Sequence, residues 1–147
     1  MSDGKPTAVL LVEDDENDVR ITRRALDRLA QPVDLHVTPD GAAALEWLAA
    51  APTLPDLVFL DINLPKMDGF ELLGHLRAHP RLATLPVIML TTSTRTEDVR
   101  RAYAAGASAY VVKPMRYPAF AELMARTLAW WTQDNRLPTH GPTLTAR

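Results

Sequence analysis

The chain alternates five short apolar runs with five longer segments of helical periodicity, and this alternation is the feature that most restricts its fold. The apolar runs cover residues 8–12, 33–37, 57–60, 87–90 and 109–112. Helices are predicted over 16–30, 41–50, 68–79, 96–105 and 117–132. Runs that are apolar on both faces are typical of parallel strands covered by helices on both sides. In the second run Asp34 and His36 alternate with apolar residues, which predicts an edge strand.

Strand–helix alternation repeated five times predicts an α/β fold, with a doubly wound parallel sheet and right-handed crossovers. A length of 147 residues suits one domain with a single core. We assign residues 1–6 to an N-terminal extension, 7–131 to the domain and 132–147 to a tail. The tail is poor in apolar residues and contains Pro138, Gly141 and Pro142.

Composition narrows the classes of function. The chain has no cysteine, which excludes disulfides, thiolate metal sites and cysteine nucleophiles and suits a reducing cytoplasm. The net charge is −2 without a strongly basic half, which argues against a nucleic-acid groove. The first apolar run is too short for a secretory signal, and no run approaches the roughly 18 apolar residues of a membrane span. We therefore predict a cytoplasmic protein without nucleic-acid or membrane partners.

Polar residues follow four of the predicted strands at the point where each strand ends. They are Glu13, Asp14 and Asp15 after the first strand, Asp61 after the third, Thr91 and Thr92 after the fourth, and Lys113 after the fifth. In open α/β sheets the functional site lies beyond the carboxyl ends of the strands, so these side chains are expected to gather there. Clustered carboxylates repel one another unless a cation is present, and an all-oxygen ligand set selects a hard ion such as Mg²⁺.

This set of residues is suited to phosphoryl transfer. Asp61 can act as a covalent nucleophile and form an aspartyl phosphate. Lys113 and Mg²⁺ would neutralise charge on the phosphoryl oxygens, and Thr91 could donate a hydrogen bond to the attached group. Asp15 is the exception, since its position favours capping of the first helix.

Four segments resemble the receiver domains of two-component response regulators in order and spacing, over about residues 7–131. They are VLLVEDDENDV, LVFLDINLPKMDGFELL, LPVIMLTTST and AGASAYVVKP. The resemblance implies a flavodoxin-like (βα)5 fold with strand order 2-1-3-4-5. It also implies a regulator that receives a phosphoryl group from a sensor histidine kinase and catalyses only its own phosphorylation and dephosphorylation.

By position, Glu13 and Asp14 resemble the acidic pair that binds Mg²⁺, and Asp61 resembles the phosphoacceptor. The backbone carbonyl of Asn63 would complete the protein ligands of the metal. Thr92 stands where the family often has alanine, which implies narrower access to the site.

Later residues match the switching parts of the family. Thr91 resembles the switch hydroxyl, Tyr110 the aromatic that changes rotamer on activation, and Lys113 the lysine that pairs with the phosphoryl group. Asn63 and Ser93 resemble, by position, residues that tune dephosphorylation in the family. The resemblance implies a cis bond between Lys113 and Pro114, whereas bond statistics alone favour trans, with cis in about 5–6% of such bonds.

Two other functions fit parts of the pattern. A haloacid-dehalogenase-like phosphatase also uses a strand-end aspartate but needs a second acid two residues later, where this chain has Asn63. An interaction module that is never phosphorylated is the other alternative, and the complete acidic, threonine and lysine set argues against it. His75 and His79 have the spacing of metal ligands but lack a third ligand nearby.

The route by which a signal leaves the domain is less constrained. Only 16 residues follow Trp131, so we expect a single-domain regulator that acts through changed association. The segments RAHPRLATLP and KPMRYPAF resemble receivers that accompany bacterial phytochrome kinases. We expect a homodimer that uses the last helix, and adjacent tryptophans cannot share one helical face, which leaves at least one of them exposed. The predicted surface contains Met115, Tyr117, Trp130 and Trp131.

Overall fold

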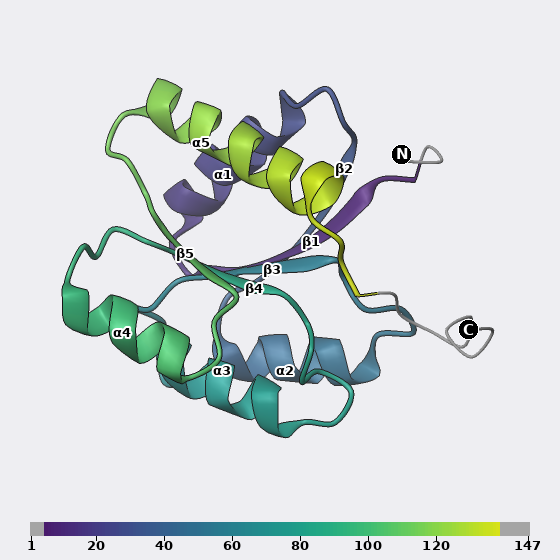
Figure 1. Cartoon of the computed structure of the whole chain (residues 1–147), viewed down its shortest axis with the longest axis vertical. Coiled ribbons are helices and arrows are strands. Elements are labelled where there is room, and N and C mark those ends of the chain that lie inside the picture. Colours follow the sequence, from purple (N-terminus) through teal and green to yellow (C-terminus); the bar gives the residue numbers. More distant parts are fainter. Residues whose placement is uncertain (1–4, 139–147) are drawn as a thin grey trace.

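The computed structural model describes residues 5–138, and these form a three-layer α/β sandwich (Figure 1). The strands are β1 (Thr7–Val12), β2 (Val33–Thr38), β3 (Leu57–Leu60), β4 (Val87–Thr91) and β5 (Ala109–Val112). The helices are α1 (Glu16–Asp27), α2 (Gly41–Ala50), α3 (Gly69–Ala78), α4 (Thr96–Ala104) and α5 (Tyr117–Ala129), followed by a π-helical turn, η1 (Trp130–Asp134). All strand pairs are parallel and the order is β2-β1-β3-β4-β5, which confirms the predicted fold class and strand order.

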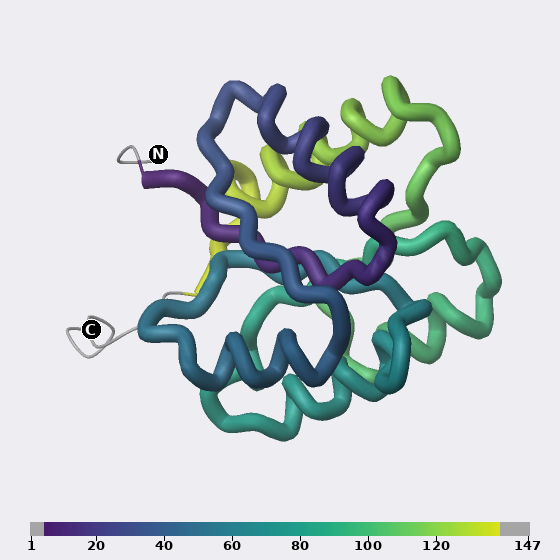
Figure 2. The backbone as a smooth tube through the Cα atoms, turned by 180° about the vertical axis from the view of Figure 1, so that it is seen from behind, coloured from purple at the N-terminus to yellow at the C-terminus, as the bar shows by residue number. Residues whose placement is uncertain are grey.

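The helices cover both faces of the sheet. Helices α1 and α5 lie on one face, and α2, α3 and α4 lie on the other (Figures 1 and 2). Alternate residues of each strand feed the two layers: Val9 and Leu11 pack towards α1 and α5, whereas Leu10 and Val12 pack towards α2 and α3. The three inner strands are therefore apolar on both sides.

Strand β2 lies at one edge of the sheet, as its mixed sequence predicted. Its side chains alternate in exposure, and Asp34 and His36 are exposed. The ring of His36 stacks on Trp47 of α2, with 4.1 Å between ring centroids. The polar side of this strand is thus partly covered by one aromatic side chain.

Aspartates fix the starts of three helices. The carboxylate of Asp15 accepts hydrogen bonds from the backbone N–H groups of Asn17 and Asp18, which confirms the predicted cap of α1. Asp40 caps α2 in the same way, and Asp68 caps α3 in a reciprocal pair with Glu71. Such caps contribute about 1 kcal/mol each, because they satisfy N–H groups that the first turn leaves unpaired.

The last helix differs from the prediction at its end. Regular α-helix stops at Ala129 and continues as the π-turn η1, where the Thr132 hydroxyl donates to the carbonyl of Leu128 at 2.6 Å. A threonine that bonds back to the preceding turn competes with the helical hydrogen bond and distorts the helix. Residues 132–134, assigned to the tail from sequence, thus belong to η1, and residues 139–147 lie outside the described part of the chain.

Trp130 is 51% exposed, whereas Trp131 packs against the core beside α5, so the two tryptophans differ in exposure although their rings contact each other edge to face. Among residues 5–138, no helix is long and apolar enough to cross a membrane.

Candidate functional site

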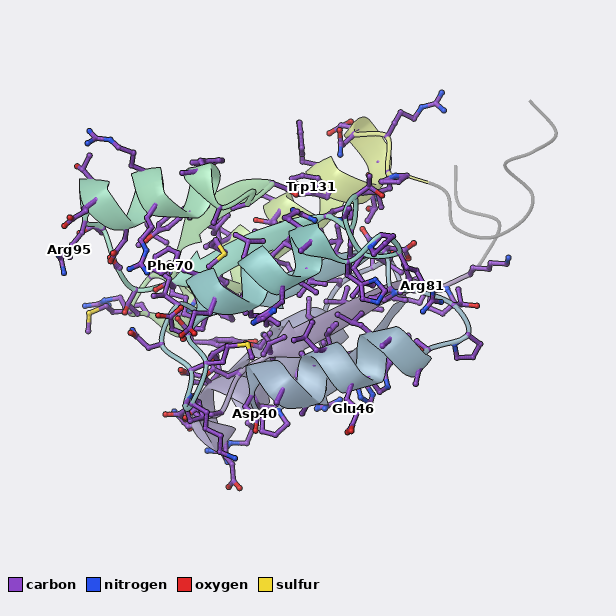
Figure 3. All side chains as sticks on the ribbon, turned by 90° about the horizontal axis from the view of Figure 1, so that it is seen from below. Asp40, Glu46, Phe70, Arg81, Arg95 and Trp131 are labelled. Atoms are coloured by element: carbon purple, nitrogen blue, oxygen red, sulfur yellow. The ribbon has the colours of Figure 1, made fainter. Side chains whose placement is uncertain are left out.

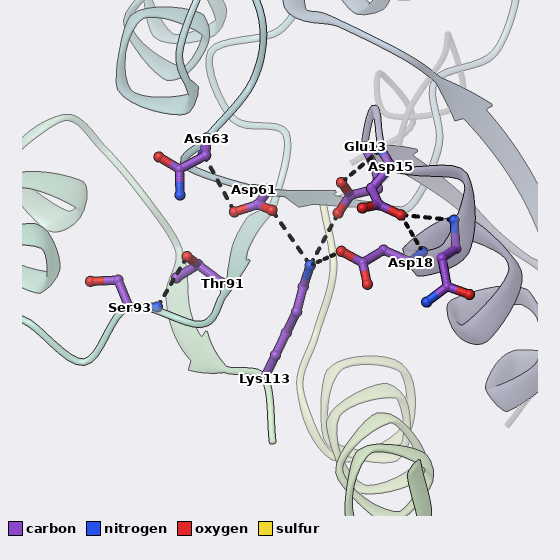
Figure 4. A network of polar contacts seen from close by, with 9 residues as sticks. Glu13, Asp15, Asp18, Asp61, Asn63, Thr91, Ser93 and Lys113 are labelled. Carbon is purple, nitrogen blue, oxygen red and sulfur yellow. Dashed lines mark hydrogen bonds and ion pairs between the residues drawn. The ribbon is translucent and has the colours of Figure 1, made fainter. Parts of the chain in front are cut away.

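The carboxyl ends of β1, β3, β4 and β5 meet at one edge of the sheet, and the predicted polar residues lie there (Figure 4). The parallel register aligns Val12 with Leu60 and Thr91 with Val112, so the residues that follow β1 and β3 emerge together. The Lys113 ammonium lies 3.0 Å from Glu13 Oε1 and 3.5 Å from Asp61 Oδ2. Strands from three parts of the sequence therefore bring two carboxylates to one cation.

Burial and the neighbouring charges shift the pKa values of Lys113 and Glu13 in opposite directions. Burial lowers the pKa of Lys113, but the charges of Asp61, Glu13 and Asp18 outweigh it, and the pKa is raised overall. Glu13 is only 4% exposed, and burial raises its pKa although Lys113 opposes the shift. The ammonium is thus held in its charged form at the centre of the acidic cluster.

Asp18 is a site residue that the strand-end argument missed. It lies in the first turn of α1, and its Oδ2 is 3.6 Å from the Lys113 ammonium. Spacing along the chain could not reveal this contact, because an acid in the first turn of a helix is usually explained by the helix dipole. Lys113 therefore has three carboxylate neighbours rather than two.

The β4 end carries a separate set of hydrogen bonds. Thr91 is fully buried, and its hydroxyl accepts a bond from the Ser93 N–H at 3.3 Å. The Tyr110 hydroxyl donates to the carbonyl of Ser93 at 3.0 Å, and the Ser93 hydroxyl donates to Asp98 at 2.6 Å. The loop between β4 and α4 is thus tied to both predicted switch residues through Ser93.

Gly69, the first residue of α3, packs closely against the backbone of Asp61 and Ile62, which follow β3. Its N–H donates to the carbonyl of Ile62 at 2.8 Å. A Cβ atom at residue 69 would collide with the Asp61 carbonyl oxygen and lie 2.9 Å from the Cα of Ile62. Only glycine allows this close approach of helix to strand without moving the Asp61 backbone.

The oxygen ligands fit Mg²⁺ in kind. Glu13 and Asp61 converge on the same cation, Asp14 is exposed beside them, and the Asn63 N–H donates to Asp61 at 3.4 Å. Within residues 5–138, no three acidic, histidine or cysteine side chains are grouped tightly enough to hold a metal by themselves. Mg²⁺ usually needs one or two carboxylates and keeps several waters, so this set together with the Asn63 carbonyl remains suitable.

A cleft of about 330 Å³ adjoins the cluster, between α1 and the loop that joins β5 to α5. Asp18 and Lys113 line it, together with Thr92, which is exposed, and Met115, which is 98% exposed.

The bond between Lys113 and Pro114 is trans, as are all other peptide bonds of residues 5–138, so the cis bond implied by the resemblance is wrong for this structure. The trans form is the intrinsically preferred one for X–Pro bonds.

The four residues of the predicted partner surface do not form one patch. Met115 and Tyr117 lie where α5 begins, and Arg24 stacks over the Tyr117 ring at 4.4 Å. Trp130 and Trp131 follow the opposite end of the helix, roughly 20 Å away at 1.5 Å per residue.

Comparison with known proteins agrees with this geometry. The family model for the response regulator receiver domain matches residues 9–126. The chain therefore belongs to the response regulator receiver family and is a receiver of phosphorelay signal transduction, as the sequence motifs predicted. This membership favours a regulator over the phosphatase alternative.

Two curated proteins and two solved structures are similar to this chain over most of its length. The chain is 36% identical to a probable methanogenesis regulatory protein, FilR2, of Methanothrix harundinacea (strain 6Ac), covering 90% of this chain and 88% of that protein. It is 32% identical to response regulator Rcp1 of Synechocystis sp., covering 90% and 94%. The solved structure of the Mn²⁺-bound form of Rcp1 gives a TM-score of 0.82 at 31% identity, covering 91% and 100%. The phosphorylated cyanobacterial phytochrome response regulator RcpA gives a TM-score of 0.86 at 29% identity, covering 92% and 100%.

Proposed function

We propose that Asp61 is the residue on which this receiver is phosphorylated. The observation that carries the proposal is the position of the Lys113 ammonium, which lies 3.5 Å from the Asp61 carboxylate before any phosphoryl group arrives. The Asp61 side chain is 15% exposed, so a donor can reach it, while Glu13 beside it is almost fully buried. A fixed cation next to a reachable carboxylate suits phosphoryl transfer, where catalysis is mostly positioning and charge stabilisation.

In the proposed reaction an Asp61 oxygen attacks the phosphorus of a phosphohistidine. The new O–P bond forms as the P–N bond of the donor breaks, and the imidazole leaves with the electron pair of that bond. Lys113 donates to the phosphoryl oxygens and offsets their charge. Bound Mg²⁺ would supply further charge neutralisation, with Glu13, Asp14, Asp61 and the Asn63 carbonyl as its proposed ligands.

We propose Thr91 and Tyr110 as the switch residues. Thr91 is buried behind the site, and within residues 5–138 its hydroxyl oxygen accepts one bond, from the Ser93 N–H, so the O–H can turn to donate to a phosphoryl oxygen and shift Ser93 as it does so. The Tyr110 hydroxyl bonds the carbonyl of the same Ser93. Movement of Ser93 would therefore carry the change from the site to the surface of β5.

A sensor histidine kinase is the proposed phosphodonor, since receivers of phosphorelays take phosphate from such kinases. The likeness to Rcp1 and to the phytochrome response regulator RcpA supports a phytochrome-type kinase. Homodimer formation through Met115, Tyr117, Trp130 and Trp131 stays a prediction, as does a cytoplasmic location without nucleic-acid or membrane partners. The exposure of Met115 and Trp130 supports their part in an interface.

The test is phosphorylation by acetyl phosphate with Mg²⁺, followed by intact-mass spectrometry. Wild type should gain one phosphoryl group that hydroxylamine removes, and Asp61→Asn or chelation of Mg²⁺ should abolish the gain. Asp27→Asn is the control, because Asp27 is an exposed acid at the end of α1. An undiminished gain on Asp61→Asn would show that another residue is the acceptor.

A further inference from the structure

Asp18 is held in place by a closed chain of contacts around the site (Figure 4). Its backbone N–H donates to Asp15 Oδ1 at 3.1 Å, and the Asp15 N–H donates to Glu13 Oε2 at 3.2 Å. Glu13 binds the Lys113 ammonium, which returns to the Asp18 carboxylate at 3.6 Å. The first turn of α1 is therefore coupled to the same lysine that neighbours Asp61.

The three carboxylates around Lys113 are not equivalent. Glu13 is closest and its side chain is only 4% exposed, so its charge cannot lose this partner without a large cost. The Asp18 side chain is 42% exposed and gives the longest of the three contacts, so water can replace the lysine there. A phosphoryl group on Asp61 adds strong oxygen acceptors, and Asp18 is the partner that Lys113 can most easily give up.

We propose that Asp18 is a positioning residue that holds Lys113 in the unphosphorylated protein and competes with the phosphoryl group for it. This inference rests on the proposed function of Asp61. Asp18 belongs to α1 and Lys113 to the segment after β5, and both line the cleft between these elements. Their ion pair bridges the cleft, so transfer of Lys113 to the phosphoryl group would unlink its two sides.

The ion pair between Asp18 and Lys113 is tested first without ligand, by a double-mutant cycle in which urea unfolding of the full chain is measured for each variant. Asp18→Asn should destabilise the wild-type protein and have little effect in the Lys113→Met background, because the partner is already absent. Glu16→Gln is the matched control, since Glu16 is an exposed acid of the same turn. Equal effects of Asp18→Asn in both backgrounds would overturn the proposal.

Competition is tested by calorimetric titration with beryllium trifluoride in saturating Mg²⁺, which mimics a phosphoryl group bound to a carboxylate. Asp18→Asn should bind it about two- to fivefold more tightly than Glu16→Gln does, the range expected for a partly exposed ion pair. Equal or weaker binding than Glu16→Gln would overturn the proposal. Failure of wild type to bind, or equal binding by Asp61→Asn, would instead contradict the proposed function.

Discussion

The two ends of the sheet each hold a partly buried cation, but they surround it with different partners. At the carboxyl end, Lys113 faces the carboxylates of Glu13, Asp61 and Asp18. At the amino end, the Arg77 guanidinium faces neutral groups, chiefly backbone carbonyls of two loops. Its Nε donates to Gly106 at 2.9 Å, and its Nη1 donates to Leu85 at 2.8 Å and Ala83 at 3.1 Å. The positive charge of Lys113 is thus neutralised by carboxylates, whereas that of Arg77 is stabilised by the dipoles of backbone carbonyls.

The pKa shifts express this difference. Burial alone lowers the pKa of Arg77, whereas acidic neighbours reverse the same effect at Lys113. Arg81 repeats the arginine–carbonyl arrangement and donates to the carbonyls of Leu48 and Ala51 where α2 ends, at the end of α2 opposite Asp40 (Figure 3). The contacts of Arg77 and Arg81 join groups within the chain, whereas we expect those of Lys113 to change when Asp61 is phosphorylated.

The largest expected effect is the loss of stability in Arg77→Met. The substitution leaves several buried carbonyls without donors, so the free energy of unfolding should fall by about 2–4 kcal/mol. Phosphorylation per folded molecule should change less than about twofold, because Arg77 is remote from the site. Urea unfolding and acetyl phosphate labelling measure the two quantities. A strong loss of labelling with unchanged stability would contradict the prediction that Arg77 supports the fold and not the phosphorylation site.

Two glycines allow a further comparison, since Gly69 makes room for the backbone of Asp61 at the carboxyl end and Gly106 makes room for the Arg77 side chain at the amino end. Gly69→Ala must displace the backbone of Asp61, and a misplacement of this kind should slow phosphorylation about 10- to 100-fold. Gly106→Ala should lower stability by about 1–3 kcal/mol with little effect on the rate, because strain in the left-handed region is added to displacement of Arg77. Gly106 has φ of 104° and would place its Cβ 2.8 Å from the Arg77 side chain.

Gly74→Ala is the control for both glycine variants, since nothing lies within 4 Å of its added Cβ. It should be phosphorylated like wild type, and its stability should rise by about 0.5–1 kcal/mol, because alanine is favoured over glycine inside a helix. If Gly69→Ala and Gly106→Ala gave the same ratio of rate loss to stability loss, the two ends would not be functionally distinct.

The smallest expected effect is a difference at alkaline pH. The folded pKa of Lys113 lies above its unfolded value, so its contribution to stability is complete below pH 10.5 and is lost as pH rises through the folded pKa. The stability difference between wild type and Lys113→Met should therefore shrink above pH 10.5, whereas that between wild type and Arg77→Met should not shrink, because burial lowers the folded pKa of Arg77 and the linkage has the opposite sign. Urea unfolding at a series of pH values measures both differences, and parallel curves would contradict this assignment.

These contrasts explain which parts could be predicted from the sequence. Glu13, Asp61 and Lys113 were predictable because each directly follows an apolar strand, and parallel strands bring such positions together. Asp18 and Arg77 were not, because each lies on an amphipathic helix where a charged residue is normally taken to face solvent. Their roles depend on loops and turns that only the folded chain brings close.

The end of α5 and the bond before Pro114 were predictable only in part. The different exposure of Trp130 and Trp131 was predictable from helical geometry. The π-turn was not, because its hydrogen bonds, from Thr132 to Leu128 and from Asn135 to Trp130, do not follow from the apolar periodicity. The trans bond before Pro114 followed from bond statistics and not from the family pattern.

The positions of the tryptophans have an optical consequence. The chain contains three tryptophans, and none lies in the cluster around Lys113. Trp47 stacks on the edge strand, and Trp130 and Trp131 contact each other beyond the far end of α5. Tryptophan fluorescence therefore does not report the local chemistry at Asp61. Any change in emission on phosphorylation would instead show that the event had travelled to the sheet edge or along α5.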